Sequence, residues 1–219
     1  MTETTAATAR KGARGRIDKR QAILDAAFTV FARRGYSQAC VQEIAEEAGV
    51  AKLTVYNHLS DKENLFRQAL TAAAETVSEE CLAVADRLRD PGDDLRPALE
   101  EVAYRLLHVC RGERAHALRW LTYAQIARFP DLVDTVQSRT SHRLGEGLAD
   151  RFARLSLSGR LRPCDPAVAA EQFLALLTGP LEARGRLGTQ EVTDAEAGGM
   201  AGSAVDTFLR AYGPETPPP

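Results

Sequence analysis

Hydrophobic positions recur at helical spacing along most of the chain. In the first such segment, Leu24 and Phe28 share one face of a helix that we expect from about Asp18 to Arg34. The alternation with period two that marks half-buried strands is absent, and Ala, Leu, Arg and Glu dominate the periodic segments. The pattern therefore predicts an all-α protein of about nine helices.

Two short helices follow the first one, with a glycine between them. A helix from about Val41 to Ala48 is followed by Gly49, where a helix C-cap requires a positive φ. The next short helix runs from about Ala51 to His58. Two short helices joined by a tight turn are typical of a helix-turn-helix, whose second helix enters the major groove of DNA.

The second of these short helices has an unusual outer face. Val55 and Leu59 are four residues apart and point inward, which leaves hydrogen-bond donors, acceptors and apolar groups outside. An exposed leucine beside a tyrosine suits thymine methyl groups and base edges better than it suits water. The outer face consists of Leu53, Thr54, Tyr56, Asn57 and His58.

Longer periodic segments fill the rest of the chain. We expect Ser60 or Asp61 to cap a long helix, and Gly92 to lie in the loop that follows it. Asp165 and Pro166 form a good cap with a proline in the first turn. This cap opens a helix that carries Phe173, Leu174, Leu176 and Leu177, and an earlier helix with Pro97 near its start carries Leu99, Val102, Leu106 and Val109 to a break near Gly112. Further helices are expected at about Glu113–Arg128, Asp131–Leu157 and Ala195–Tyr212.

Composition indicates a globular protein with an uneven distribution of charge. The chain has 219 residues, of which 44% are hydrophobic, and a net charge of -2. This is enough for one or two domains with a buried core. Between residues 10 and 20, six arginines and lysines stand against Asp18 alone, so a basic arm precedes a mildly acidic body. Taken alone, such an arm is equally compatible with a solvated tail.

Several classes of protein are disfavoured. No apolar run approaches the roughly 20 residues that span a bilayer, and the N-terminal sequence has no apolar segment typical of a secretory signal. We therefore expect a cytoplasmic protein that does not contact membranes. The widely spaced cysteines favour free thiols over a disulfide or a zinc site. They are Cys40, Cys81, Cys110 and Cys164.

We expect neither a metal nor another cofactor, and no enzymatic activity. One helix does not place His108 and Cys110 on the same face, which argues against a metal site there. Glycine-rich phosphate loops, the Gly-x-Ser-x-Gly elbow and the His-Glu-x-x-His motif are all absent. An enzyme built on a helical bundle is the weaker alternative.

The stretch Phe28–Phe66 resembles the tetracycline-repressor (TetR) family of bacterial transcriptional regulators. It contains Gly-Tyr, Ile-Ala, Ala-Gly-Val, Thr-x-Tyr-x-His and Lys-Glu-x-Leu elements in register. The resemblance implies a regulator that binds double-stranded DNA at a palindromic operator as a homodimer. The base-reading residues that it implies are Gln42, Thr54 and Asn57. The phosphate-binding residues that it implies are Lys52, Tyr56, His58 and Lys62.

The sequence departs from the family pattern at the helices that face DNA. Ala39 and Cys40 stand where Thr or Ser usually caps the second helix, and Ala51 replaces a capping Ser of the third. The loss of a hydroxyl cap costs about 1 kcal/mol. Leu53 stands where a small residue is common, and we expect it to make an apolar contact with a base.

The C-terminal two thirds of the chain resemble the AefR-type C-terminal domain found in part of that family. The segments that carry this resemblance are Arg128–Leu132, Arg160–Pro166 and Ala170–Phe173. The resemblance to the TetR family implies a ligand pocket among the middle helices and a four-helix bundle of the last two helices across a dimer axis. A single helix-turn-helix domain contacts few base pairs, so a dimer is also favoured on physical grounds.

We expect a small apolar or aromatic effector, because the middle helices carry aromatics with polar tips. Aromatic residues at helical spacing are also typical of an ordinary hydrophobic core. The same alternative applies to the apolar residues of the last helices. The candidate ligand contacts are Tyr104, His108, Trp120, Tyr123 and Phe129. The candidate dimer-interface residues are Phe173, Leu174, Leu177, Leu181, Val205, Phe208 and Leu209.

The expected domain organisation has four parts. They are a disordered basic arm over residues 1–15, a helix-turn-helix DNA-binding domain over 16–62, a helical ligand-binding and dimerisation domain over 63–212 and a disordered tail over 213–219. The expected function is that of a repressor that a ligand releases from its operator. In the alternative, a partner protein or oxidation of Cys40 switches the regulator.

Overall fold

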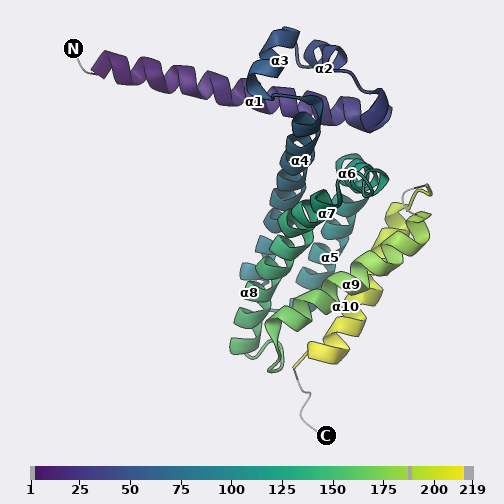
Figure 1. The fold of residues 1–219 in the computed structure, drawn as a ribbon. Coiled ribbons are helices and arrows are strands. Elements are labelled where there is room, and N and C mark those ends of the chain that lie inside the picture. Colours follow the sequence, from purple (N-terminus) through teal and green to yellow (C-terminus); the bar gives the residue numbers. More distant parts are fainter. Residues whose placement is uncertain (1–2, 187–188, 215–219) are drawn as a thin grey trace, which may run out of the picture. The chain divides into compact units, whose positions relative to one another are not determined.

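The computed structural model of the protein describes residues 3–186 and 189–214. All regular secondary structure within these residues is helical, which confirms the predicted all-α fold (Figure 1). The helices form two compact units. Unit 1 contains the residues up to Ala73 together with Ala117–Val136, and unit 2 contains Ala74–His116 and the residues from Gln137 onward.

Unit 1 holds the predicted helix-turn-helix. In Figure 1, α2 and α3 lie on the same side of α1. The core beneath them is apolar, since Phe31, Ile44 and Val55 are each 0% exposed. The helices that contribute to unit 1 are α1 (Glu3–Gln38), α2 (Val41–Glu47), α3 (Lys52–His58), the first half of α4 (Lys62–Ala85), most of α6 (Glu113–Ala124) and α7 (Pro130–Gln137).

Two glycines lie where the sequence predicted that helices of this unit end. Gly35 has a φ of 73° and a ψ of 165°, which interrupts α1 directly after Arg34. Gly49 has a φ of 65° and lies in the turn between α2 and α3. Residues with a Cβ rarely adopt a positive φ, so glycine fits both positions.

The N-terminal part of α1 differs from the prediction. The helix begins at Glu3, whereas the sequence predicted a disordered arm over residues 1–15 and a helix from about Asp18. Residues 1–2 lie outside the described part of the chain. Alanine, arginine and lysine are strong helix formers. A helix nucleated in the core also gains one hydrogen bond for each residue that it adds. The helix therefore extends from Asp18 toward the N-terminus.

Unit 2 is a bundle whose helices have well-formed caps. Asp165 accepts hydrogen bonds from the N–H groups of Ala167 and Val168, which confirms the predicted start of α9. Thr193 and Glu196 form a capping box at the start of α10. Beyond the second half of α4, the elements of unit 2 are the 3₁₀ turn η1 (Asp86–Arg89), α5 (Leu95–Arg111), the π-helical turn η2 (Ser138–His142), α8 (Arg143–Leu157), α9 (Pro166–Gly185) and α10 (Asp194–Tyr212).

The helix predicted over Asp131–Leu157 forms, with a π-helical turn in its middle. The structure divides it into α7, the π-helical turn η2 and α8. The turn contains the sequence Ser-Arg-Thr-Ser-His. Serine and threonine have a lower helix propensity than alanine, because their hydroxyls are able to hydrogen-bond to nearby backbone groups. At the end of the chain α10 stops at Tyr212, and most of the predicted tail, residues 215–219, lies outside the described residues.

The core of unit 2 contains most of the residues predicted at the dimer interface. Three phenylalanine rings, from Phe152, Phe173 and Phe208, lie with their centroids 4.9 to 5.6 Å apart. A side chain buried within its own chain is not available to a partner, so these residues belong to the core instead. The buried ones are Phe173, Leu177, Leu181, Val205 and Phe208, whereas Leu174 and Leu209 are half-buried.

No helix in the described part of the chain is both long and apolar enough to cross a membrane. No disulfide joins the four cysteines, all of which lie in the described part of the chain. Within residues 3–186 and 189–214, no cluster of histidine, cysteine and acidic side chains has the arrangement of a metal site.

Candidate nucleic-acid interface

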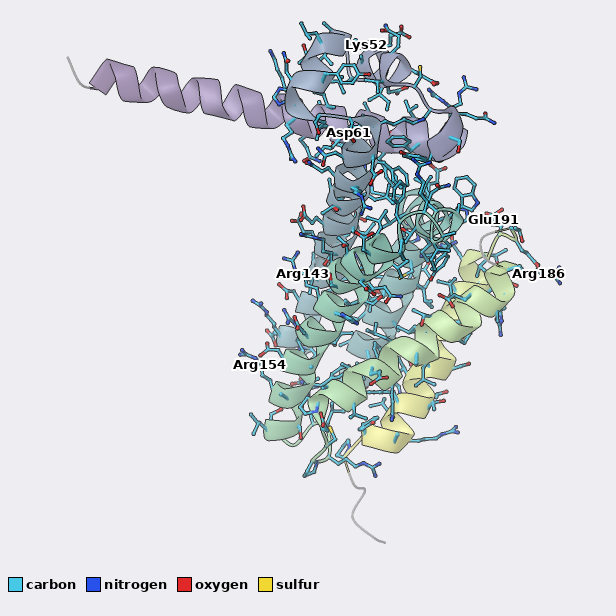
Figure 2. The ribbon with its side chains drawn as sticks, in the orientation of Figure 1. Lys52, Asp61, Arg143, Arg154, Arg186 and Glu191 are labelled. Carbon is cyan, nitrogen blue, oxygen red and sulfur yellow. The ribbon has the colours of Figure 1, made fainter. Side chains whose placement is uncertain are left out.

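The helix α3 exposes the face that the sequence predicted. Val55 is 0% exposed and Leu59 is 2% exposed, so they anchor the helix, whereas the Leu53 and Tyr56 side chains are 70% and 43% exposed. A major groove about 12 Å wide admits a helix held in this way. Lys52 begins α3 (Figure 2). Of the remaining predicted contact residues on this helix, Lys52 and Asn57 are exposed and Thr54 and His58 are half-buried.

The caps of the two short helices differ from each other. The thiol Sγ of Cys40 accepts a hydrogen bond from the Glu43 N–H over 3.4 Å, so sulfur takes the place of the usual hydroxyl at the start of α2. The sequence predicted no side-chain cap for α2, because sulfur is only a weak hydrogen-bond acceptor. That prediction was wrong. Ala51 makes no side-chain cap, as expected for α3.

Ion pairs hold α2 against α1. Arg33 contacts Glu43 over 2.9 Å and Glu47 over 3.4 Å, and Arg34 contacts Glu43 over 3.2 Å. Hydrogen bonds from Arg33 and then Arg34 lower the pKa of the Glu43 carboxyl group. The side chain of Gln42, a predicted base reader, is exposed and donates to Glu46 Oε1 over 2.9 Å.

Lys62 joins the start of α4 to the end of α1. Its Nζ donates a hydrogen bond to the carbonyl oxygen of Ser37 over 3.0 Å and lies 5.0 Å from the centre of the Tyr36 ring. Burial and then the neighbouring charge of Arg128 lower its pKa. Lys62 is therefore half-buried and engaged within unit 1, and its contact with a phosphate stays a prediction.

An aromatic cluster beneath the helix-turn-helix includes a residue that the sequence placed elsewhere. Phe31, Tyr36, Phe66 and Phe129 form ring pairs with centroids 4.9 to 6.1 Å apart. Phe129 was a candidate ligand contact, but it is 2% exposed and packs against Tyr36 and Phe66. It belongs to the core of unit 1.

The other candidate ligand contacts divide between the units. Tyr104 and His108 lie on α5 in unit 2, whereas Trp120 and Tyr123 lie on α6 in unit 1. Trp120 is 48% exposed and Tyr123 is 49% exposed. Unit 2 has a surface hollow of about 480 Å³, but none of these four residues lines it. The hollow is lined by residues 93–96, 159–160, 209 and 213–214.

Two family models match the chain. Residues 23–69 match the model of bacterial regulatory proteins of the tetR family, which covers the helix-turn-helix. Residues 97–214 match the model of the AefR-like transcriptional repressor C-terminal domain.

Individual proteins agree with the family models. The transcriptional repressor AcnR of Corynebacterium diphtheriae is 32% identical over 164 residues, which are 71% of this chain and 75% of the repressor. A crystal structure of a TetR-family regulator from Mesorhizobium loti matches with a TM-score of 0.84 and 30% identity, over 90% of this chain and 98% of that one. The flavonoid-responsive regulator FrrA matches with a TM-score of 0.69 and 26% identity, over 91% of this chain and 99% of that one.

Proposed function

Because the chain belongs to the tetR family of bacterial regulatory proteins, we propose that it is a repressor that a small apolar or aromatic ligand releases from a palindromic operator. Regulators of this family bind DNA through the helix-turn-helix and act as dimers. The exposed face of α3 carries the proposal, because it combines Leu53, Tyr56 and Asn57 above a buried anchor. Two such helices on one dyad suit half-sites about 34 Å apart.

The proposed roles of the contact residues follow their chemistry and exposure. Base edges require hydrogen-bonding or methyl-contacting side chains, and phosphates require cations or hydroxyl and imidazole donors. The proposed base contacts are Gln42, Leu53, Thr54 and Asn57. The proposed phosphate contacts are Lys52, Tyr56, His58 and Lys62.

Lys52→Ala tests the DNA-binding function. We expect lower affinity for every DNA sequence, because a phosphate contact carries no sequence information. The slope of log affinity against log salt should fall in magnitude by about 0.9, because the variant neutralises one phosphate fewer than the wild type. Fluorescence anisotropy titrations at several salt concentrations, with an operator enriched from randomised DNA, give both quantities.

Arg154→Ala provides the control, because it removes an exposed cation from α8 in unit 2 (Figure 2). It should leave the salt slope unchanged. A wild-type protein that enriches no sequence from randomised DNA contradicts the proposed function.

Leu53→Ala tests the apolar base contact while it preserves the helix. The truncation removes apolar surface that we expect to cover a thymine methyl group, so discrimination at one base-pair position should fall about fivefold, or about 1 kcal/mol. Selection from randomised DNA measures this preference position by position. An unchanged preference at every position eliminates the proposed contact.

A similar protein supports the proposed class of effector. FrrA is described as flavonoid-responsive, and its similarity to this chain supports an effector with aromatic rings and a few polar groups. A thermal-shift screen that includes flavonoids should find stabilising compounds, because ligand at 100 times its Kd stabilises by about 2.7 kcal/mol. A hit must also release the operator. A parallel titration with hydrogen peroxide tests the alternative switch, in which exposed Cys40 is oxidised.

The burial of the predicted dimer residues moves the proposed interface to the outer faces of α9 and α10. Small side chains line these faces and allow two helices to approach closely. A Cβ added at Gly179, Gly199 or Gly202 meets no atom within 4 Å, so space is open there in the single chain. The proposed contact surface consists of Val168, Ala175, Gly179, Gly199 and Gly202.

A further inference from the structure

The first helix, α1, carries a run of cations that the proposed DNA contacts do not include. Residues 10–20, which we call the basic segment, hold six cations and one anion and so have a net charge of +5. The structure places the whole segment in α1, within the same compact unit as the helix-turn-helix. The cations are Arg10, Lys11, Arg14, Arg16, Lys19 and Arg20.

The rest of the DNA-binding region carries no excess of positive charge. Residues 21–73 contain five lysines and arginines against six aspartates and glutamates. Arg33 and Arg34 both pair with Glu43 of α2, and Lys62 is half-buried. Much of the positive charge near α2 and α3 is therefore balanced or held within the protein.

Two further arginines of unit 1 are engaged by contacts within it. Nη1 of Arg67 on α4 lies 2.6 Å from Oδ2 of Asp131 on α7, so these helices share an ion pair. The guanidinium carbon of Arg128 lies 4.8 Å from the centre of the Tyr36 ring, near the end of α1. The excess positive charge of unit 1 therefore lies in the basic segment.

The basic segment begins where α1 leaves the core and extends away from it. Lys19 and Arg20 are exposed, and the Arg20 guanidinium donates a hydrogen bond to Oε1 of Gln68 on α4. In Figure 1 the purple N-terminal part of α1 continues beyond α2 and α3. At 1.5 Å per residue the segment is about 15 Å long, which corresponds to about four base pairs of B-DNA.

We propose that the basic segment is a second DNA-contact surface, which binds the phosphates next to the half-site that α3 of the same chain contacts. The proposal rests on the proposed function, because it requires α3 to lie in a major groove. DNA carries one negative charge for about every 1.7 Å of its axis, and lysines and arginines that neutralise phosphates supply affinity without regard to sequence. The segment therefore adds affinity only where the duplex continues beyond the half-site.

Replacement of four cations by alanine tests the proposal. Alanine favours the helix, and Arg20 is kept because of its contact with Gln68. Binding is measured by fluorescence anisotropy at several salt concentrations, to a duplex that ends at the half-site and to duplexes extended on either side by about one helical turn, or about ten base pairs. The fourfold variant is Arg10→Ala/Lys11→Ala/Arg14→Ala/Arg16→Ala.

The extended duplexes should reveal the contact. The wild type should bind one extended duplex more tightly than the bare half-site, and with a steeper dependence on salt. On that duplex, the slope of log affinity against log salt should be smaller in magnitude by about 2–4 for the fourfold variant, because each lost phosphate contact removes about 0.9. On the bare half-site the fourfold variant and the wild type should bind equally.

Two controls separate the position of the charge from its amount. The matched control replaces four exposed arginines of unit 2 by alanine, and its slopes should equal those of the wild type. These arginines are Arg87, Arg89, Arg105 and Arg154. The conservative variant Arg10→Lys/Arg14→Lys/Arg16→Lys should also bind like the wild type, because lysine neutralises a phosphate as well. Thermal unfolding shows whether each variant is folded, and Arg10→Ala/Arg14→Ala replaces the fourfold variant if the latter is not.

The outcomes separate this proposal from the proposed function. If the fourfold variant and the wild type have equal slopes on every duplex, the basic segment is a solvated tail, and the proposal is overturned while the proposed function stands. Equal losses on bare and extended duplexes, or an equal loss in the matched control, also overturn it. A conservative variant that binds as weakly as the fourfold variant overturns the phosphate contact in favour of one specific to arginine. Wild-type protein without sequence-specific binding overturns the proposed function and this proposal together.

Discussion

Phe129→Ala should lower the free energy of unfolding by about 3–5 kcal/mol. The ring is 2% exposed and lies 5.2 Å from Tyr36 and 5.6 Å from Phe66, measured between centroids. Its removal leaves a cavity in a close-packed core, and the neighbouring rings collapse into such a cavity only in part. Arg67 and Arg128 are also deprived of the ring face against which they stack.

The measurement is thermal unfolding followed by circular dichroism, with operator binding at the same temperatures. A loss of this size should lower the melting temperature by about 10 °C in a chain of this length. It should also weaken operator binding wherever unit 1 is partly unfolded. Trp120→Ala is the control, because its side chain is 48% exposed and its truncation should change stability little.

The opposite result has a clear meaning for Phe129. A melting temperature close to that of the wild type, together with loss of effector binding, indicates the ligand contact that the sequence first suggested. Such a result contradicts the role of Phe129 in the core of unit 1.

Local patterns in the sequence predicted the helix-turn-helix well. The breaks at Gly35 and Gly49 depend on backbone angles that glycine alone adopts easily, and the start of α9 depends on the side chain of Asp165. The inward direction of Val55 follows from a spacing within a single helix. Each of these features involves neighbours in sequence, so no knowledge of the tertiary fold was needed.

The partners of buried residues were not predictable in the same way. Periodicity shows that Phe129, Phe173 and Phe208 are buried, but a core, a ligand pocket and a dimer interface all produce the same apolar spacing. The position of Phe129 depends on Tyr36 and Phe66, which are distant in the sequence. The Arg-Phe-Pro-Asp order at 128–131 carries part of a family resemblance, but its contacts with α1 and α4 required the structure.

Gly202→Arg should convert the protein to a monomer and lower operator affinity by about 100-fold or more, because a second DNA-binding domain then no longer contributes to binding. Gly202 lies on α10, where an added Cβ meets no atom within 4 Å in the single chain. A long cation at this position should prevent the close approach of a partner helix. The fold of the single chain should not suffer, since arginine is a better helix former than glycine by about 0.8 kcal/mol.

Size-exclusion chromatography with light scattering measures the oligomeric state, and anisotropy titrations with the full operator and a half-site measure binding. Gly145→Arg is the matched control, because it makes the same change in α8, where the added Cβ also meets open space. The control should stay dimeric and bind the operator normally. A Gly202→Arg variant that remains a dimer with full affinity shows that this face of α10 does not form the interface, and loss of half-site binding as well indicates damage to the fold instead.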